Sequence, residues 1–430
     1  MKEFCILEKR GHVSVRAGEK SIDIGRGWTS DVRMVCEGGK VMGTRMRRIL
    51  ATGLAGALLM SGAVLGGCGK QSPEDSAGVQ SAEEEMLSEN EAPAEDSLPE
   101  TDAIEPIDVT ENTTKTVTIT ATGDCTLGKT QDQSYEGSFN AYYDSYGPDY
   151  FFDNVRGVFE QDDMTIVNLE CVLTTSEDRV EKTFNLKGEP EYVEIMTGSS
   201  VEACSMGNNH TYDYGESGFQ ETKDVLENAG ITYAYTQQTG MFTTQDGVKV
   251  GIVSSSLLSQ SSERTDMLKE GIQNLRKEGA EVVIACCHWG IEKEYYPTDY
   301  QQTTAHDLID AGADLVIGNH PHVLQGVEEY NGKLILYSLG NFCFGGNKNP
   351  SDKNTMMFQQ TFTIENGEVK TDQLDAKIIP CRLSSSGGYN DYQPVIASGD
   401  TKQNIIDQVN EYSSPYSDIS FDSEGKLRTE

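Results

Sequence analysis

From residue 115 onward, short apolar runs alternate with longer amphipathic stretches, which is the pattern of an α/β domain. We expect strands at 116–121, 165–167, 203–206, 248–254, 281–286, 314–317 and 334–337. Several of these runs are apolar on both sides, so they should be buried on both faces. Helices are expected at 218–229, 266–278 and 300–311, two of them ended by Gly230 and Gly312.

The end of the chain changes character. Residues 356–364 and 375–379 are predicted to form a closing antiparallel pair, joined near Asn366-Gly367. Beyond residue 384 the sequence is polar, with one amphipathic helix expected at 401–412. We therefore predict a single domain at 115–383 and a polar C-terminal extension at 384–430.

Charge is distributed unevenly along the chain. The net charge is -35, and residues 71–114 hold fourteen Asp or Glu and no Lys or Arg. Such a segment cannot bury enough apolar surface to offset its chain entropy, so residues 69–114 are predicted to be a disordered, acidic tether. The acidity also excludes nucleic acid as a partner, because phosphates would be repelled.

Residues 42–68 have the layout of an export signal. Arg45, Arg47 and Arg48 precede an apolar stretch at 49–64, which is short for a membrane span and leads to Leu65-Gly66-Gly67-Cys68. The segment resembles a bacterial lipoprotein signal, in which Cys68 is lipidated and becomes the mature N-terminus. The alternative is an uncleaved anchor helix. Both predict an extracytoplasmic domain attached to the cell membrane.

Residues 1–41 precede this signal and show no clear periodicity. Codons for Glu37-Gly38-Gly39-Lys40 could form a purine run resembling a ribosome-binding site before Met42. Our hypothesis is that translation starts at Met42 or Met46 and that residues 1–41 are never made. Detection of a peptide from residues 1–41 would contradict it.

The cysteines after Cys68 are odd in number and lack paired spacing. Most lie in or beside apolar strand-like runs, where a thiol is a small core residue. They are Cys125, Cys171, Cys204, Cys286, Cys287, Cys343 and Cys381.

Polar clusters follow five of the predicted strands. They are Gly123-Asp124, Asn168-Leu169-Glu170, Gly207-Asn208-Asn209-His210, His288-Trp289-Gly290 and Gly318-Asn319-His320-Pro321-His322. The carboxyl ends of strands in an α/β sheet converge on one crevice, so these clusters should meet. A single histidine at a strand end is more often a core or turn residue, and His306, in a predicted helix, is expected to be structural. Five clusters in succession favour a functional site.

The clusters supply two carboxylates, a side-chain amide and four imidazoles. Such a set suits one or two divalent or trivalent transition metals, namely Mn, Fe or Zn. Two metals could hold a hydroxide and a phosphoryl or carbonyl oxygen together. His320 and His322 would face opposite ways on an extended segment, unless the chain turns at Pro321 and lets each serve one metal.

Longer runs around these clusters carry a family resemblance. They are Gly123–Gly128, Asn168–Glu170, Asn208–Gly215, His288–Glu292, Gly318–Gln325 and Tyr337–Phe342. In order and spacing they resemble the CapA-type poly-γ-glutamate capsule biosynthesis family, within the calcineurin-like metallophosphoesterase superfamily. The resemblance covers about residues 117–380. It implies an α/β fold, a metallophosphoesterase-like β-sandwich flanked by helices, as a single catalytic domain.

The resemblance also implies roles for individual residues. The first metal would be bound by Asp124 and His322, the second by Asn209, His288 and His320, with Glu170 bridging both. His210 would be the general acid or transition-state donor, oriented by Asp213. Residues 338–342 would form a wall or support loop, or a simple buried turn. The superfamily's first motif usually has a histidine where this chain has Thr126, so the first metal would be held less firmly.

Three functions follow from these expectations. The first is a metal-dependent hydrolase or transferase acting outside the cell on poly-γ-glutamate or a related anionic polymer. The second is a general extracytoplasmic metallophosphoesterase acting on a phosphoester. The third is a non-catalytic capsule export or anchoring factor that works with capsule synthesis partners. Lys182 or Lys187 could hold an anionic substrate, although such lysines are more often simply solvated.

Overall fold

The computed structural model describes residues 4–9, 12–17, 20–23 and 113–429. The chain divides into two compact units, residues 1–102 and 103–430. In the first unit, β1 (Phe4–Lys9), β2 (His12–Ala17) and β3 (Lys20–Asp23) form an antiparallel sheet. The expected signal at 42–68, its Cys68 and the tether up to residue 112 lie outside the described residues. Among the helices that are described, none has the length and apolar character needed to cross a membrane.

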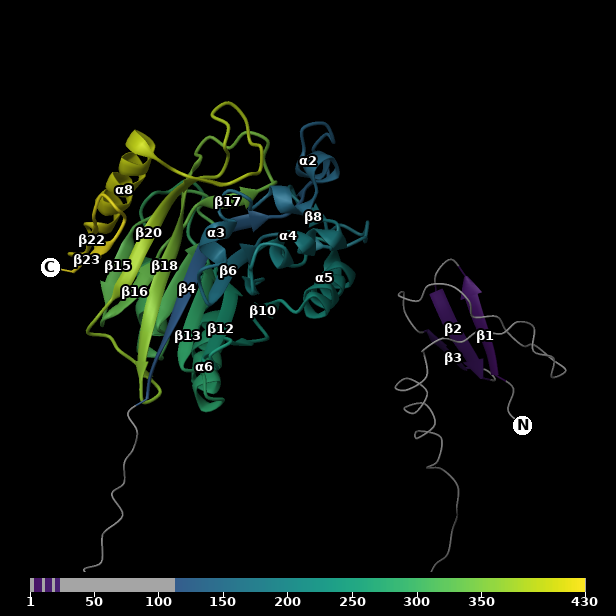
Figure 1. The fold of residues 1–430 in the computed structure, drawn as a ribbon, viewed down its shortest axis with the longest axis horizontal. Coiled ribbons are helices and arrows are strands. Elements are labelled where there is room, and N and C mark those ends of the chain that lie inside the picture. Colours follow the sequence, from purple (N-terminus) through teal and green to yellow (C-terminus); the bar gives the residue numbers. More distant parts are fainter. Residues whose placement is uncertain (1–3, 10–11, 18–19, 24–112, 430) are drawn as a thin grey trace, which may run out of the picture. The chain divides into compact units, whose positions relative to one another are not determined.

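The second unit contains a nine-stranded sheet in the order β10-β9-β6-β4-β18-β20-β21, with β17 paired to β4 and β19 to β18 (Figure 1). Its parallel strands are β4 (Thr114–Thr126), β6 (Met164–Leu169), β9 (Ala203–Ser205), β10 (Thr232–Ala234) and β17 (Asn341–Phe344). The antiparallel strands are β18 (Asn354–Glu365), β19 (Glu368–Val369), β20 (Asp375–Arg382) and β21 (Val395–Ile396). The predicted closing pair is therefore confirmed as β18 and β20.

A six-stranded sheet follows the order β11-β12-β13-β14-β16-β15. Its central strands are parallel and comprise β12 (Lys249–Ser256), β13 (Val282–His288), β14 (Leu315–Asn319) and β16 (Lys333–Leu336). The antiparallel edge strands are β11 (Gly240–Thr243) and β15 (Val327–Tyr330). The sheet is therefore parallel at its centre, and predicted site residues lie at the carboxyl ends of these parallel strands.

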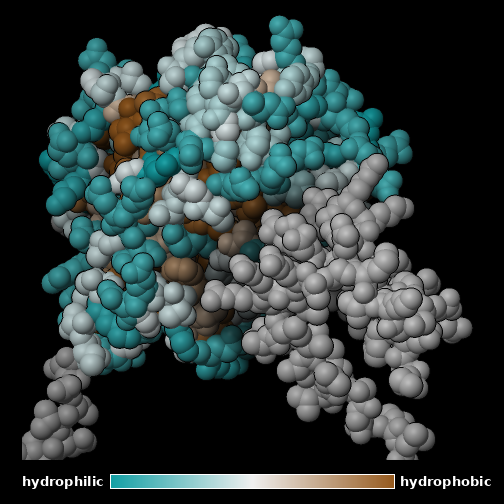
Figure 2. Space-filling view, turned by 45° about the vertical axis from the view of Figure 1, so that its right-hand side comes forward, coloured by the Kyte–Doolittle hydropathy of each residue, from teal (hydrophilic) through white to brown (hydrophobic). Residues whose placement is uncertain are grey.

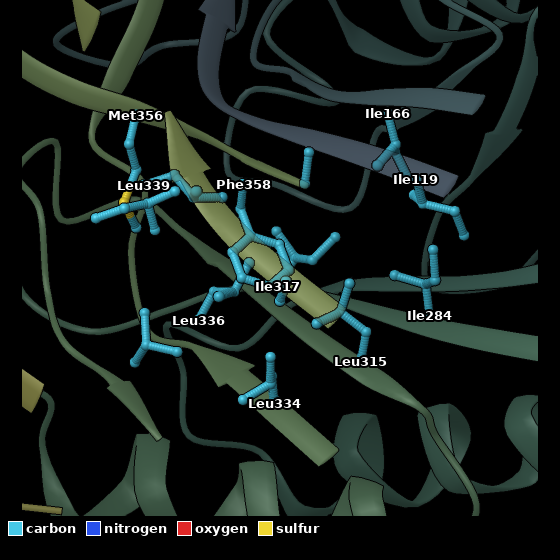
Figure 3. Close-up of a cluster of buried hydrophobic side chains, with 14 of the residues drawn as sticks. Ile119, Ile166, Ile284, Leu315, Ile317, Leu334, Leu336, Leu339, Met356 and Phe358 are labelled. Carbon is cyan, nitrogen blue, oxygen red and sulfur yellow. The ribbon is translucent and has the colours of Figure 1, made fainter. Parts of the chain in front are cut away.

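The main core lies between these two sheets (Figure 3). Ile119 and Ile166 come from the nine-stranded sheet, and Ile284 and Leu315 come from the six-stranded one. All four are buried, and each such side chain contributes roughly 1.5–3 kcal/mol by leaving water. The strands read as apolar on both sides because both faces of each sheet are covered.

Helices cover the outer faces. Leu268 and Ile272 of α6 (Ser262–Lys277) and Leu308 of α7 (Asp299–Asp310) pack on the six-stranded sheet. A capping box formed by Thr298 and Gln301 begins α7. The nine-stranded sheet is covered by α2 (Phe139–Tyr146), α3 (Arg156–Phe159), α4 (Val193–Thr197) and α5 (Gly215–Ala229). The α/β sandwich flanked by helices, predicted from the sequence, is confirmed.

The C-terminal residues join the same core. The predicted helix is present as α8 (Gly399–Ser413), and it buries Ile405, Ile406 and Val409 in the cluster between the sheets. A hairpin of β22 (Ser420–Phe421) and β23 (Leu427–Arg428) follows. The amino-acid sequence of this segment is mostly polar because only one face of α8 is apolar.

Hydrophilic residues predominate on the visible described surface (Figure 2), and the cysteines of the second unit lie in the core. In Figure 2 the visible described surface is mostly hydrophilic, with hydrophobic residues showing in limited places. All seven cysteines of the described second unit are buried and free. Their prediction as core residues is confirmed.

Candidate metal centre

The predicted site residues come from both sheets. Asp124 lies near the carboxyl end of β4, and Glu170 directly follows β6. Asn209 and His210 lie just beyond β9, His288 ends β13, and His320 and His322 follow β14. Contacts between these side chains show that the strand ends meet, as expected for parallel strands that end at one edge.

Glu170 lies at the centre of the cluster and is completely buried. Neither of its carboxylate oxygens has a hydrogen-bond donor among the described residues. Its Oε1 is 3.5 Å from Nε2 of His288 and 3.9 Å from Nε2 of both His210 and His322. Burial, with a further contribution from Asp124, raises the pKa of Glu170 well above its usual range. A buried carboxylate without a donor is costly, and a bound cation would relieve that cost.

Two groups of side chains around Glu170 have the geometry of metal sites. One contains Glu170, His288 and His320, and the other contains Asp124, Glu170 and His322, with ligand atoms within 4.8 Å of one another in each. Nε2 of His288 lies 3.1 Å from Nδ1 of His320. Oδ2 of Asp124 lies 3.1 Å from Nδ1 of His322.

These separations fit ligands of a shared ion. Two atoms each about 2.1 Å from one ion, at right angles, are about 3.0 Å apart. Glu170 belongs to both groups, which is the position of a bridging ligand. The residues present therefore fit one metal in each group.

The backbone turns sharply between Gly318 and His322. This turn is needed if the two histidines are to serve different metals. His320 and His322 both have left-handed backbone conformations, with φ of 98° and 58°. Such values are uncommon outside glycine and are typical of functional sites. The turn directs His320 to His288 and His322 to Asp124.

Asp124 is fixed by neighbours whose roles were not predicted. Its Oδ1 accepts a hydrogen bond from Nδ2 of Asn168 at 2.8 Å, and Oδ1 of Asn168 accepts one from Nδ2 of Asn208 at 3.3 Å. The backbone N–H of Asp124 donates to the Gly340 carbonyl at 2.9 Å. That approach requires glycine at position 123, because a Cβ there would lie 2.0 Å from the same carbonyl oxygen.

The side chains of His210 and Asp213, predicted as an acid and the residue that orients it, are in contact. Nδ1 of His210 lies 2.6 Å from Oδ2 of Asp213, and this leaves Nε2 on the side of Glu170. Nζ of Lys182 donates to Oδ1 of Asp213 at 2.6 Å and to the Asn209 carbonyl at 2.7 Å. Burial lowers the pKa of His210, and Asp213 opposes that effect. The sequence had suggested Lys182 only as a general cation near the site.

The other imidazoles differ in charge state. Burial lowers the pKa of His288 well below its usual range and, with His322, lowers that of His320 to about 4. Burial would also lower the pKa of His322, but the carboxylates of Glu170 and Asp124 outweigh it and raise the pKa to about 10. At neutral pH, His288 and His320 are therefore uncharged, which is the form of imidazole that can bind a metal.

The remaining expected residues divide into those near the cluster and those away from it. Oδ1 of Asn209 is buried and accepts no hydrogen bond within the described part of the chain, which fits a ligand role. Lys187 is paired with Glu177 at 2.7 Å, and His306 with Glu328 at 2.8 Å. Lys187 and His306 thus contact carboxylates outside the two candidate metal groups. Asn341, expected only in a wall, contacts His322.

A protein-family model described as bacterial capsule synthesis protein PGA_cap matches residues 118–346, more than half of the chain. The chain belongs to this family. The CapA-type resemblance is thereby confirmed, and every candidate ligand lies inside the PGA_cap match.

Curated relatives agree with the PGA_cap assignment. The capsule biosynthesis protein CapA of Bacillus anthracis is 27% identical over 57% of this chain and 63% of its own length. The PGA biosynthesis protein CapA of Bacillus subtilis is 29% identical over 46% of this chain and 57% of its own. The chain thus spans less than two thirds of either relative. A hypothetical protein of Thermus thermophilus aligns with 61% of this chain and 99% of its own, at 14% identity and a TM-score of 0.39.

Proposed function

We propose that this chain is a metal-dependent hydrolase or transferase that acts on poly-γ-glutamate or a related anionic envelope polymer during capsule biosynthesis. The proposal rests on the buried Glu170. Its carboxylate oxygens have no hydrogen-bond donor among the described residues, and Glu170 belongs to both groups of side chains that could hold a metal. The polymer is suggested by the names of the two relatives from Bacillus. Polymer-synthesising proteins of the capsule would be its partners.

The first metal would be held by Asp124, Glu170 and His322, and the second by Glu170, His288 and His320 with Asn209. When bound, such ions polarise a phosphoryl or carbonyl oxygen and lower the pKa of bound water. Mn, Fe and Zn all accept mixed carboxylate and imidazole ligands.

The chain's own residues supply proton transfer and orientation. Asp213 accepts the Nδ1 hydrogen of His210, so Nε2 is the atom that can take up or release a proton beside Glu170. Lys182 balances the charge of Asp213 and has a side chain 27% exposed. It is therefore a cation that an anionic substrate can approach in a chain of net charge -35.

Metal content and turnover test the proposal together. The purified full chain should contain metal and cleave or transfer a γ-glutamyl polymer, and His210→Ala should lose turnover while retaining metal. His306→Ala is the matched control, because His306 of α7 pairs with Glu328 and its loss should leave turnover unchanged. Turnover of a generic phosphodiester without action on the polymer would instead indicate a general phosphoesterase.

A non-catalytic capsule export or anchoring factor is the second candidate. It is favoured by Thr126, which occupies a usual ligand position and whose hydroxyl donates to the Glu170 backbone carbonyl at 3.3 Å. Metal-free protein from cells, with normal capsule in a His210→Ala strain, would support this candidate and exclude the enzyme.

The proposed location is the outer face of the cell membrane, through lipidated Cys68. The support is the arginine-rich and apolar segment that ends at this cysteine. Cys68→Ser should abolish incorporation of labelled fatty acid and release the protein from the membrane fraction. Unchanged labelling would exclude Cys68 as the anchor.

A further inference from the structure

Asn341 lies beside the first metal group. It begins β17, is paired in register with Asp124 of β4, and is 4% exposed. Its Oδ1 is 2.9 Å from Nδ1 of His322, the same nitrogen that lies 3.1 Å from Oδ2 of Asp124. Nδ1 of His322 therefore lies within about 3 Å of two oxygen atoms that can each bind a cation.

The orientation of the amide is defined by its other end. Nδ2 of Asn341 donates to the backbone carbonyl of His322 at 3.3 Å. This contact leaves Oδ1, the end that can bind a metal, facing Nδ1 of His322. A flipped amide would lose the bond to the carbonyl, because two oxygens would then face each other.

The first group has room for a further ligand. Its carboxylate and imidazole members are Asp124, Glu170 and His322, so one position of a four-coordinate ion is left for water, substrate or another side chain. Where the superfamily usually has a histidine, this chain has Thr126. The hydroxyl of Thr126 donates a hydrogen bond to the backbone carbonyl of Glu170. Asn341 approaches the same group from the neighbouring strand.

We propose that Oδ1 of Asn341 is a ligand of the first metal and replaces the imidazole that Thr126 cannot supply. The inference rests on the metal centre of the proposed function. Oδ1 of Asn341 lies 2.9 Å from Nδ1 of His322, which matches the roughly 3.0 Å expected between two ligands of one ion.

This assignment makes the two metal sites chemically different. The first site has three oxygen-donor residues and one histidine, Asp124, Glu170, Asn341 and His322. The second has two oxygen-donor residues, Glu170 and Asn209, and two histidines, His288 and His320. Oxygen-rich sites suit harder ions, so the first site should prefer Mn²⁺ over Zn²⁺ more strongly than the second.

Metal titration of the full chain tests the assignment. Mn²⁺ binding followed by electron paramagnetic resonance should show two ions in the wild type. In Asn341→Ala the first ion should bind at least about tenfold more weakly, whereas Asn341→Asp, which keeps an oxygen donor, should retain both. Thr126→Val is the matched control, and it should also retain both ions.

A second measurement separates a ligand from a residue that only orients His322. In a His288→Ala background, which weakens the second site, Co²⁺ is bound to the first site and its visible absorption is recorded. Removing a coordinated amide oxygen in Asn341→Ala should change the absorption bands. Weaker binding with an unchanged spectrum would overturn the assignment.

The failure of this inference is distinguishable from failure of the centre itself. Two tightly bound ions in Asn341→Ala, with Asp124→Asn losing one, would refute Asn341 as a ligand and leave the centre intact. Unchanged metal content in both Asp124→Asn and Glu170→Gln would refute the centre, and with it the proposed function. Thermal denaturation of each variant verifies that it is folded.

Discussion

Nζ of Lys182 lies 2.6 Å from Oδ1 of Asp213, whose Oδ2 lies 2.6 Å from Nδ1 of His210. Asp213 is thus held between a cation and an imidazole, and it also accepts the Leu186 N–H at 2.6 Å. Burial lowers the pKa of His210, Asp213 acts to raise it, and Lys182 adds to the lowering. The protonation of Nε2 beside Glu170 therefore depends on burial and on the opposing charges of Asp213 and Lys182.

Lys182→Met should reduce turnover by about tenfold to a hundredfold, a part of the roughly 10²–10⁴-fold that general acid or base catalysis contributes. Loss of the cation removes one of the effects that lower the pKa of His210, so this pKa should rise. The limb of the pH–rate profile that reports this group should shift to higher pH, which steady-state kinetics across pH would measure.

Lys182→Arg should restore much of the activity, because it keeps the positive charge. Lys187→Met, which removes a lysine paired with Glu177, should leave the profile unchanged. An unshifted profile in Lys182→Met would show that Lys182 has no electrostatic effect on His210.

Glu170→Gln should abolish binding of both metals and yet stabilise the metal-free protein at pH 7 by about 1–3 kcal/mol, the usual cost of a buried group without a partner. The pKa of Glu170 is raised in the folded state above its ordinary value of 4.5. Its contribution to stability is therefore full below about pH 4.5 and is lost as pH rises through the folded-state pKa.

Chemical denaturation of both proteins in chelator, from acidic to neutral pH, measures this effect. The stability advantage of the variant should grow as pH rises. Equal stability of the two proteins at pH 7 would contradict the account of Glu170 as an uncompensated buried carboxylate.

The two metal sites should depend differently on pH. Since the pKa of His322 is about 10 in the metal-free chain, a metal entering the first site must displace its proton. Affinity there should rise by up to about tenfold per pH unit below pH 10. His320, with a pKa of about 4, is already neutral, so His320 and His288 add no such dependence to the second site above about pH 5.

Calorimetric titration in buffers of different ionisation enthalpy would count the protons released at each site. Release of one proton linked to His322 should disappear in His322→Ala. Equal proton release at the two sites would contradict the difference in environment between His322 and the other two histidines.

Gly123→Ala should destabilise the protein by roughly 1–3 kcal/mol and weaken the first metal, because overpacking forces the backbone apart. The added Cβ would lie 2.0 Å from the Gly340 carbonyl oxygen, which accepts the Asp124 N–H. Thermal denaturation and metal titration measure the two effects. Gly157→Ala in α3, where the added Cβ meets no atom within 4 Å outside the local backbone, is the control and should not destabilise the protein.

Much of the fold follows from local pattern. The seven predicted strands and three central helices are present, because each is an apolar run or an amphipathic stretch, and some end at clear signals, such as Gly230 after α5. Short elements were missed, among them β17 and α4, because a few residues carry too little periodicity. Asn341 lies in such a short element, and its role was missed with it.

The candidate site was likewise predicted only in part from the sequence. The amino-acid sequence by itself determined which residue types follow the strands, and parallel strands bring such residues to one edge, so Asp124, Glu170 and His288 could be named in advance. Only the tertiary structure decided that Asn341 faces His322 and that Lys182 reaches Asp213. These contacts depend on the packing of a neighbouring strand and of the loop before Leu186, and sequence spacing contains no information about either. The physical reason is that strand ends are positioned by regular backbone hydrogen bonds, whereas loop side chains are positioned by whatever they pack against.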